Sequence, residues 1–314
     1  MVELIEKYHK PDPRWTIWGA NTYDDFIRSF MIYGKFHKDV PKKIVDDFQI
    51  VERLICYSYY YYPLIDEAFS KSTRLFESAV KLRIADLGLE TGNKFESLEK
   101  KIKRIEKYTS PQVYEEWKKA RKVRNIFAHP EAGSVMGITI INAFFQMVNI
   151  INTLFLDRNT IEYNELSLAN LKEESKHLKD DLFIFEFENH PILVWSILPY
   201  SCFSNNETLK SFWTLHPVLI DFPQSVENLV FTHPICLRLI NVVIDQNEFS
   251  AIDLSTGKSI KAVKTAEPEN KVALKKYKNL IASSDQKVQE IYWHYLETEL
   301  SNEVVKFLYY ECWD

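Results

Sequence analysis

The feature that most constrains the fold is a change in hydrophobic period close to residue 180. Before that point, apolar side chains recur at helical spacing over long stretches, which predicts amphipathic helices. After it, short runs of β-branched and aromatic residues are separated by turn residues, which predicts strands. From about Pro268 the helical period returns. The sequence therefore predicts an α+β chain, in which an all-α bundle precedes an α+β domain with an antiparallel sheet.

Local helix signals divide the first half of the chain. Pro41 and Pro111 stand where a helix can begin, and Gly88 stands where one can end. We expect helices at residues 23–33, 41–61, 64–87 and 95–105, another from Pro111 onward, and one at 132–156. The expected divisions are a helical N-terminal extension (1–40), a helical domain (41–160) and the C-terminal α+β domain (161–314).

The second half of the chain contains the strand signals. The expected strands are residues 182–187, 192–198, 212–222, 229–233, 236–245 and 248–254. Ser255-Thr256-Gly257 is expected to form a turn, and helices follow it to the end of the chain. His190, His216 and His233 precede prolines, and Cys202 and Cys236 lie nearby in sequence. They could contribute to a metal site, but their spacing matches no zinc pattern and His-Pro is ordinary turn chemistry.

Residues 132–156 carry no charge at all. A stretch of that length could span a bilayer. However, Asn142, Gln146, Asn149 and Thr153 recur at helical spacing and form one polar stripe. We therefore expect a buried helix of a soluble protein, whose polar stripe lines a site or a dimer interface.

The run Lys118–Pro130, KKARKVRNIFAHP, contains the most informative residues. On a helix, Arg124 falls on the same stripe as Trp117, Ala120 and Phe127, where an apolar residue is expected. A guanidinium on such a stripe costs free energy unless it has a partner or a function.

His129 follows this helix. Because Pro130 disfavours the helical conformation at the preceding residue, we expect His129 at or just past the helix C-terminus. There its ring can approach Arg124 and Asn125, and the helix dipole favours the protonated imidazole by up to about 2 kcal/mol. A histidine in that position can act as an acid or a base near neutral pH, or simply cap the helix.

The spacing Arg124-Asn125-x-x-x-His129 resembles the signature of the HEPN superfamily. The resemblance covers residues 41–160. It implies that the predicted bundle is of the HEPN type, with the motif at the end of its third main helix. It also implies that two copies of the motif face each other in a homodimer and form a metal-independent ribonuclease site. Many HEPN proteins place an acidic residue on the preceding helix to hold the arginine. Glu77 is the candidate, the alternative being an exposed helical glutamate.

The charge around the motif suggests a nucleic-acid partner. Between Lys94 and Arg124 there are eleven Lys or Arg against five Glu, although the whole chain carries a net charge of −5. The candidate RNA-binding residues lie on the polar side of the motif helix: Lys118, Lys119, Arg121 and Lys122. An ordinary solvated face is the alternative. The tyrosine-rich run at residues 56–62 could stack on bases or pack in the core or an interface.

Together these features predict a metal-independent endoribonuclease. Cleavage through the 2′-hydroxyl of RNA needs a proton acceptor, a proton donor and a positive charge beside the phosphate. His129 would move protons, and Arg124 would hold the phosphate. Asn125 would orient one of these two side chains. The alternative is a non-catalytic HEPN binding or dimerisation module beside a C-terminal recognition domain.

No cofactor or metal motif is present, and no Gly-rich phosphate loop, GxSxG or HExxH occurs. Four scattered cysteines without a CxxC pair indicate free thiols, and no signal segment is evident at the N-terminus. We therefore expect a cytoplasmic protein that uses no membrane. The resemblance implies a prokaryotic toxin or antiviral-defence role, with an antitoxin or regulatory partner.

Overall fold

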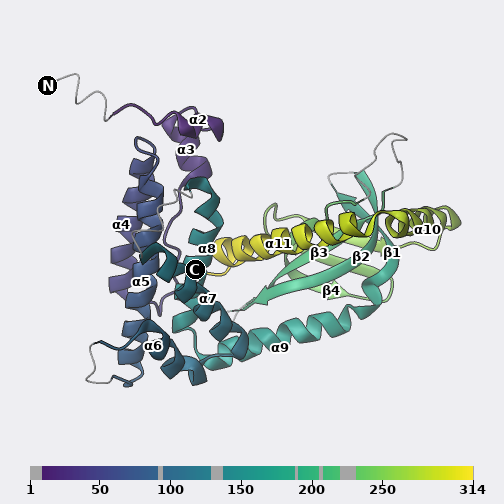
Figure 1. The fold of residues 1–314 in the computed structure, drawn as a ribbon. Coiled ribbons are helices and arrows are strands. Elements are labelled where there is room, and N and C mark those ends of the chain that lie inside the picture. Colours follow the sequence, from purple (N-terminus) through teal and green to yellow (C-terminus); the bar gives the residue numbers. More distant parts are fainter. Residues whose placement is uncertain are drawn as a thin grey trace. The chain divides into compact units, whose positions relative to one another are not determined.

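The structure is a computed structural model that describes residues 9–90, 95–128, 137–187, 190–204, 208–219 and 231–313. The chain divides into two compact units (Figure 1). The helical unit comprises Met1–Ile161 with Trp313–Asp314, and the barrel unit comprises Glu162–Cys312. The combination of a helical unit and a β-rich unit confirms the α+β class.

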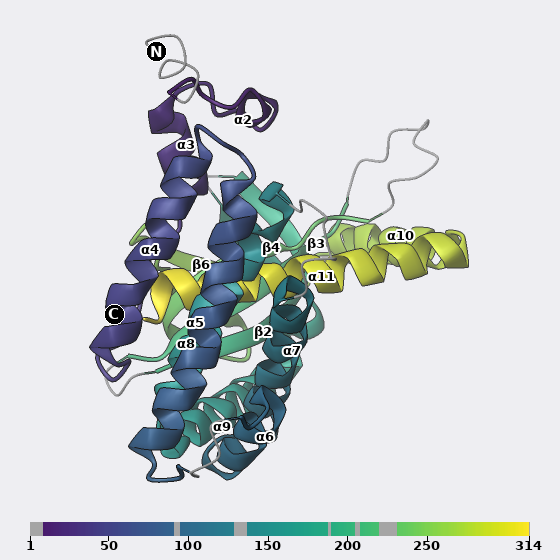
Figure 2. The ribbon, with the colours of Figure 1, turned by 60° about the vertical axis from the view of Figure 1, so that its left-hand side comes forward.

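The described secondary structure of the helical unit consists of helices. Its elements are α2 (Arg14–Ile17), α3 (Tyr23–Phe30), α4 (Lys42–Ser58), α5 (Leu64–Asp86), α6 (Leu98–Ile105), η1 (Glu106–Tyr108), α7 (Pro111–Ala128), η2 (Gly137–Ile140), α8 (Ile141–Phe155) and the first turn of α9 (Arg158–Glu174). Figure 2 shows α4 and α5 running side by side. Helix α5 also contacts α6, α7 and α8, so it lies at the centre of the unit.

Helix α5 follows the predicted pattern closely. Its expected apolar stripe is buried at Ile65, Phe69, Phe76 and Val80. The helix ends where Gly88 adopts a positive φ of 63°, which glycine accepts without steric cost. There Gly88 N–H donates to the Ala85 carbonyl and Leu89 N–H to the Ile84 carbonyl, both at 2.9 Å. This is the Schellman pattern that closes many helices at a glycine.

Residues 12–40 share the core of the helical unit. Trp15 and Phe26 are fully buried, and Trp15 Nε1 donates to the Ser58 carbonyl at 2.6 Å. Asp12 accepts from the Tyr62 amide at 3.0 Å. The described part of the expected N-terminal extension, residues 1–40, is therefore anchored to α4 by large aromatic side chains.

The uncharged stretch forms η2 and α8, and residues 132–136 lie outside the described residues. Among the described helices, only Gly137–Phe155 is long and apolar enough to span a membrane, and 61% of its apolar window is buried. The polar stripe is used inside the unit. Gln146 donates to Glu116 at 3.2 Å, Thr153 accepts from the Trp117 indole at 3.0 Å, and Asn149 accepts from the Trp313 indole at 2.6 Å. For these three residues, our expectation of a site or a dimer interface was wrong.

The sheet of the barrel unit is closed. Its strands are β1 (Lys179–Phe187), β2 (His190–Phe203), β3 (Lys210–Pro217), β4 (Ile235–Ile244), β5 (Glu248–Asp253) and β6 (Ser259–Lys264). Each strand pairs antiparallel with the next, and β6 pairs with β1 with Ile184 opposite Val263. The antiparallel prediction is confirmed, and the closure was not predicted.

In the barrel unit, one strand prediction fails and one strand was not predicted. Residues 231–233, the described part of the expected strand 229–233, form no strand. Strand β6 was not expected, because two lysines and a serine interrupt the short apolar pattern of its sequence, SIKAVK. Ala262 is buried inside the barrel and Ile260 packs partly against the same core, while backbone pairing with both neighbours stabilises the strand.

The barrel interior is filled by alternate side chains of the strands. The buried residues include Phe183, Phe185, Val194, Ile197, Trp213, Leu215, Leu237, Leu239, Phe249 and Ala251. Leu171 of α9 and Leu178 of η3 (Lys176–Leu178) pack against the same cluster. Helix α10 (Pro268–Ser283) covers part of the outer surface, where Tyr277 packs against Leu182 and Leu193. Helix α11 (Gln286–Glu311) is long and straight along the barrel wall (Figure 1).

Candidate functional site

The motif helix α7 begins where the sequence predicts. Pro111 is its first residue, and the Ser110 hydroxyl accepts from the Val113 amide at 3.3 Å. The helix continues to Ala128, directly before His129. His129 and Pro130 lie outside the described residues, so the role of His129 stays a prediction.

The structure brings Arg124 and Glu77 together from two helices. Arg124 Nη2 donates to Glu77 Oε2 at 2.6 Å, although the residues are 47 positions apart. The side chains are 28% and 20% exposed, so the pair is half-buried. Arg124 is thus the cation on the apolar stripe, and Glu77 is the partner that makes its burial tolerable.

Lys81 is a second partner of the same carboxylate. It lies one turn after Glu77 on α5, and its Nζ is 2.8 Å from Glu77 Oε1. Burial raises the pKa of Glu77, but hydrogen bonds from Lys81 and Arg124 outweigh it and hold the pKa below its usual value. The group is therefore a carboxylate at neutral pH and is not suited to donate a proton. Lys81 was missed in the sequence, although the Glu-to-Lys spacing of four residues was the available signal.

Two cations around one carboxylate leave the cluster with a local excess of positive charge. Arg124 Nη1 makes only a long contact, 3.5 Å, with Asn125 Oδ1. The Nε of Arg124 is buried and has no hydrogen-bond partner among the described residues. Glu77 therefore fixes one edge of the guanidinium, while Nη1 has no strong acceptor among the described residues. A group so placed can hold an anion such as a phosphate oxygen.

Most of the predicted RNA-binding residues form ion pairs with glutamates of the helical unit. Lys118 pairs with Glu115 at 2.7 Å and Lys119 with Glu116 at 2.6 Å. Lys122 is exposed and forms no ion pair with a described residue. Two of these three lysines therefore have part of their charge offset by a glutamate three residues earlier on α7.

Arg121 is not on the solvated face where we expected it. Its side chain is 20% exposed, and Nη1 is 3.3 Å from Glu99 Oε2 of α6. Its Nε is buried without a hydrogen-bond partner among the described residues. The prediction was wrong because α6 packs against α7 and covers that side of the helix.

A basic cleft of about 560 Å³ lies beside the first turn of α7. Its cations are Lys103, Lys107, Lys118 and Arg158, against Glu106 and Glu115. Arg158 Nη1 donates to the Lys107 carbonyl at 3.0 Å. Arg158 was missed in the sequence, because it lies forty residues beyond Lys118 and reaches the cleft only through tertiary packing.

The tyrosine-rich run does not form a continuous platform. Tyr59 and Tyr62 are buried, whereas Tyr57 and Tyr61 are each 59% exposed. The Tyr62 hydroxyl accepts from the Ile138 amide at 2.9 Å, and this bond anchors η2 to the segment between α4 and α5. Core packing thus accounts for Tyr59 and Tyr62.

In the described part of the chain, no group of three or more His, Cys, Asp or Glu residues is placed to hold a metal ion. The histidines and cysteines of the barrel unit that we considered therefore do not converge there. His216 is buried, and burial lowers its pKa to about 4.

The chain matches no protein-family model, and no curated protein matches it. The resemblance to the HEPN superfamily therefore depends on the motif residues and on their surroundings in the helical unit.

Proposed function

We propose that the protein is a metal-independent endoribonuclease of the HEPN type. The observation that supports this most is the half-buried ion pair between Glu77 of α5 and Arg124 of α7. It joins an acidic residue on a preceding helix to the motif arginine, five residues before His129. The fold of the helical unit as a HEPN-type bundle is part of the same proposal.

In this mechanism the 2′-hydroxyl of RNA attacks the adjacent phosphorus. The bond from phosphorus to the 5′-oxygen breaks, and a cyclic phosphate remains on the 3′ end. His129 of one copy takes the proton from the 2′-hydroxyl, and His129 of a second copy gives one to the leaving oxygen. Arg124 holds the phosphate and its developing charge, and Asn125 orients the side chain of Arg124 or of His129. Glu77 positions Arg124 and exchanges no proton.

The basic cleft beside α7 supports RNA as the partner. Its cations outnumber its carboxylates, and it lies on the same helix as the motif. A groove of this charge can follow a phosphate backbone, and binding should then weaken steeply with salt. We place the enzyme in the cytoplasm, in a toxin or antiviral-defence role under a regulatory partner, as the family resemblance implies.

The decisive experiment is incubation of the pure protein with labelled RNA in EDTA. We expect cleavage that leaves a cyclic phosphate, and no cleavage of DNA or of RNA methylated at the 2′-oxygen. His129→Ala and Arg124→Ala should each abolish it. Arg124→Lys should restore little, since an ammonium lacks the two-pronged grip of a guanidinium. Activity that requires a divalent cation, or equal cleavage of DNA, would refute the mechanism.

A second candidate is a non-catalytic HEPN binding module. The observation that favours it is the pairing of Lys118, Lys119 and Arg121 with glutamates, which reduces the charge offered to RNA. It predicts dimerisation without RNA cleavage in the experiment above, and no effect of His129→Ala on dimerisation.

A further inference from the structure

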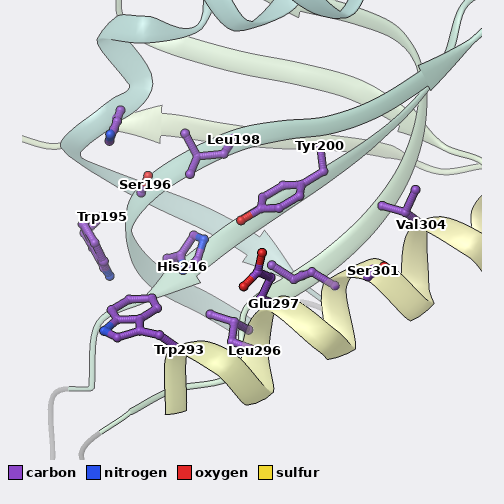
Figure 3. A pocket seen from close by; sticks show the side chains of 12 residues that line it. Trp195, Ser196, Leu198, Tyr200, His216, Trp293, Leu296, Glu297, Ser301 and Val304 are labelled. Atoms are coloured by element: carbon purple, nitrogen blue, oxygen red, sulfur yellow. The ribbon is translucent and has the colours of Figure 1, made fainter. Parts of the chain in front are cut away.

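The barrel unit contains a pocket of about 600 Å³ between the outer side of β2 and β3 and helix α11. Figure 3 shows the side chains that enter it from the two strands and from the helix. On β2, Val194 and Ile197 pack into the barrel, whereas Leu198 and Tyr200 face the pocket. This volume is typical of small-molecule sites. The pocket plays no part in the ribonuclease proposal.

Aromatic rings form much of the pocket wall. Trp195 and Tyr200 come from β2, His216 from β3 and Trp293 from α11 (Figure 3). The rings of Trp195 and His216 have centroids 5.8 Å apart. Because burial lowers the pKa of His216 to about 4, its imidazole is neutral at neutral pH. Such walls suit a flat ring system that can stack on them.

Two charged side chains line the same pocket. Glu297 projects from α11, and Lys179 begins β1. Neither forms an ion pair with a described residue, whereas Lys264 and Lys278 nearby pair with Asp181 and Asp180 at 2.5 and 3.1 Å. Figure 3 shows the Glu297 carboxylate on the same side of the pocket as the Tyr200 hydroxyl. The pocket thus offers one acceptor group and one cation without partners in the described chain.

The charges at the pocket suit a ligand that carries both N–H donors and an anionic group. Lys278 Nζ lies 5.1 Å from the ring centroid of Trp195 and is ion-paired with Asp180. Lys179 forms no ion pair with a described residue and can attract an anion. A flat ring that presents donors to Glu297 and an anionic group to Lys179 matches both charges.

We propose that this pocket binds a guanine nucleotide, either free or as one residue of an RNA. The base stacks against the tryptophans. Glu297 accepts the adjacent ring N–H and amino hydrogens of guanine, a pair of donors that adenine, cytosine and uracil do not present to a carboxylate. Lys179 provides the cation for the phosphate. This inference is independent of the ribonuclease proposal.

The test is isothermal titration calorimetry of the full-length protein with GMP, AMP, CMP and UMP. GMP should bind about ten-fold more tightly than the others, the discrimination expected of one two-pronged contact. Glu297→Gln should abolish that preference, whereas Glu290→Gln, an exposed glutamate on the same helix, should keep it. Guanosine should bind more weakly than GMP, and Lys179→Gln should remove that difference.

The aromatic wall has its own matched control. Trp293 is 46% exposed, and Trp18 in the helical unit is 49% exposed. Trp293→Ala should weaken GMP binding about ten-fold, consistent with the loss of one stacking partner, whereas Trp18→Ala should not. Trp293→Phe keeps a stacking ring and should bind within a few-fold of the unaltered protein. Thermal unfolding of each variant establishes that it is folded.

Two further ligands distinguish the remaining possibilities. An RNA hexamer with a single guanine, titrated into the His129→Ala variant, tests the RNA-borne source against free GMP. Binding of either one that depends on Trp293 and Glu297 supports the proposal. Absence of such binding by both at millimolar concentration overturns it, as does equal binding of all four nucleotides. Binding of tetramethylammonium that Trp293→Ala and Glu297→Gln both abolish would also overturn it and show a cation cage.

Discussion

Glu77 lies between two cations, and this arrangement determines how its substitution should affect stability and activity. With both Arg124 and Lys81 within hydrogen-bond distance, the carboxylate offsets the charge of a half-buried guanidinium. Removing one member of such a pair costs more than the pair contributes, because the other charge remains partly buried. The effect is reduced here by solvent, since each side chain is at least one-fifth exposed.

Glu77→Gln should therefore affect both stability and activity. We expect a loss of about 1 to 2 kcal/mol in the free energy of unfolding, and at least about ten-fold slower RNA cleavage as Arg124 loses its fixed orientation. Urea unfolding and the EDTA cleavage assay measure the two effects. Glu67→Gln, at an exposed position of the same helix, is the control. Equal stability and equal activity of the two variants would show that Glu77 does not hold Arg124 in solution.

His216 should make the stability of the protein depend on pH. Its pKa is lowered by burial from 6.5 to about 4 in the folded state. Between those values the unfolded chain binds more protons at this residue, so stability is full above about pH 6.5 and falls as the pH decreases toward 4. This residue can lower the free energy of unfolding by at most about 3 kcal/mol. In urea unfolding at about pH 7 and about pH 5, His216→Gln should reduce the difference between the two values, and His233→Gln, whose side chain is 65% exposed, should not.

Helix α8 connects several segments of the helical unit. Its apolar residues fill the core, and its few polar side chains bind neighbouring segments. Asn152 is fully buried, accepts from the His37 amide at 3.0 Å and donates to the carbonyls of Lys35 and Val148 at 2.9 and 3.0 Å. One side chain thus satisfies three backbone groups and ties the segment before α4 to the core.

Asn152→Ala should remove the side-chain partner of the His37 amide and of the Lys35 carbonyl in the interior, whereas the Val148 carbonyl keeps its helical bond from the residue 152 amide. We expect a loss of about 2 to 3 kcal/mol in the free energy of unfolding, which is the usual cost of burying unsatisfied polar groups. Asn142→Ala, at a half-buried position of the same helix, should cost less than about 1 kcal/mol. Urea denaturation of both variants decides the matter, and indistinguishable midpoints would show that water replaces the amide of Asn152.

The proposed mechanism requires a homodimer, because each copy supplies a single His129. Ile126, on the last turn of α7, is 57% exposed, an apolar side chain beside the motif that a second copy could cover. Two copies meeting at this helix end would bring their motifs together.

Light scattering at micromolar concentration should give twice the 37.1 kDa mass of one chain. Ile126→Glu should shift the protein toward the monomer and reduce cleavage in proportion, since a charge buried in the interface is unpaired. Ile50→Glu, at a 46% exposed position on α4, is the control and should change neither. A monomer that retains full cleavage activity would exclude the shared site.

Several properties of this protein could be predicted from local sequence. Helix α5 and the start of α7 were predictable from apolar periodicity, Gly88 and Ser110-Pro111, because these signals determine the backbone conformation of the residues next to them. Strands β1 to β5 were predictable for the same reason, since their β-branched and aromatic runs are continuous. The motif at Arg124 and Asn125 was likewise visible, as was Glu77 as a candidate once the family pattern was considered.

Other properties depend on contacts between distant residues, which no local pattern encodes. Strand β6 is weak by itself and exists because it closes the barrel against β1 and β5. Arg121 is covered because α6 packs on α7, and Arg158 reaches the basic cleft from forty residues beyond Lys118. Trp195 and Trp293 meet at one pocket only through the placement of α11 along the barrel. Periodicity determines which face of an element is apolar, but only tertiary packing decides what covers that face, and therefore which charges are paired and where pockets remain.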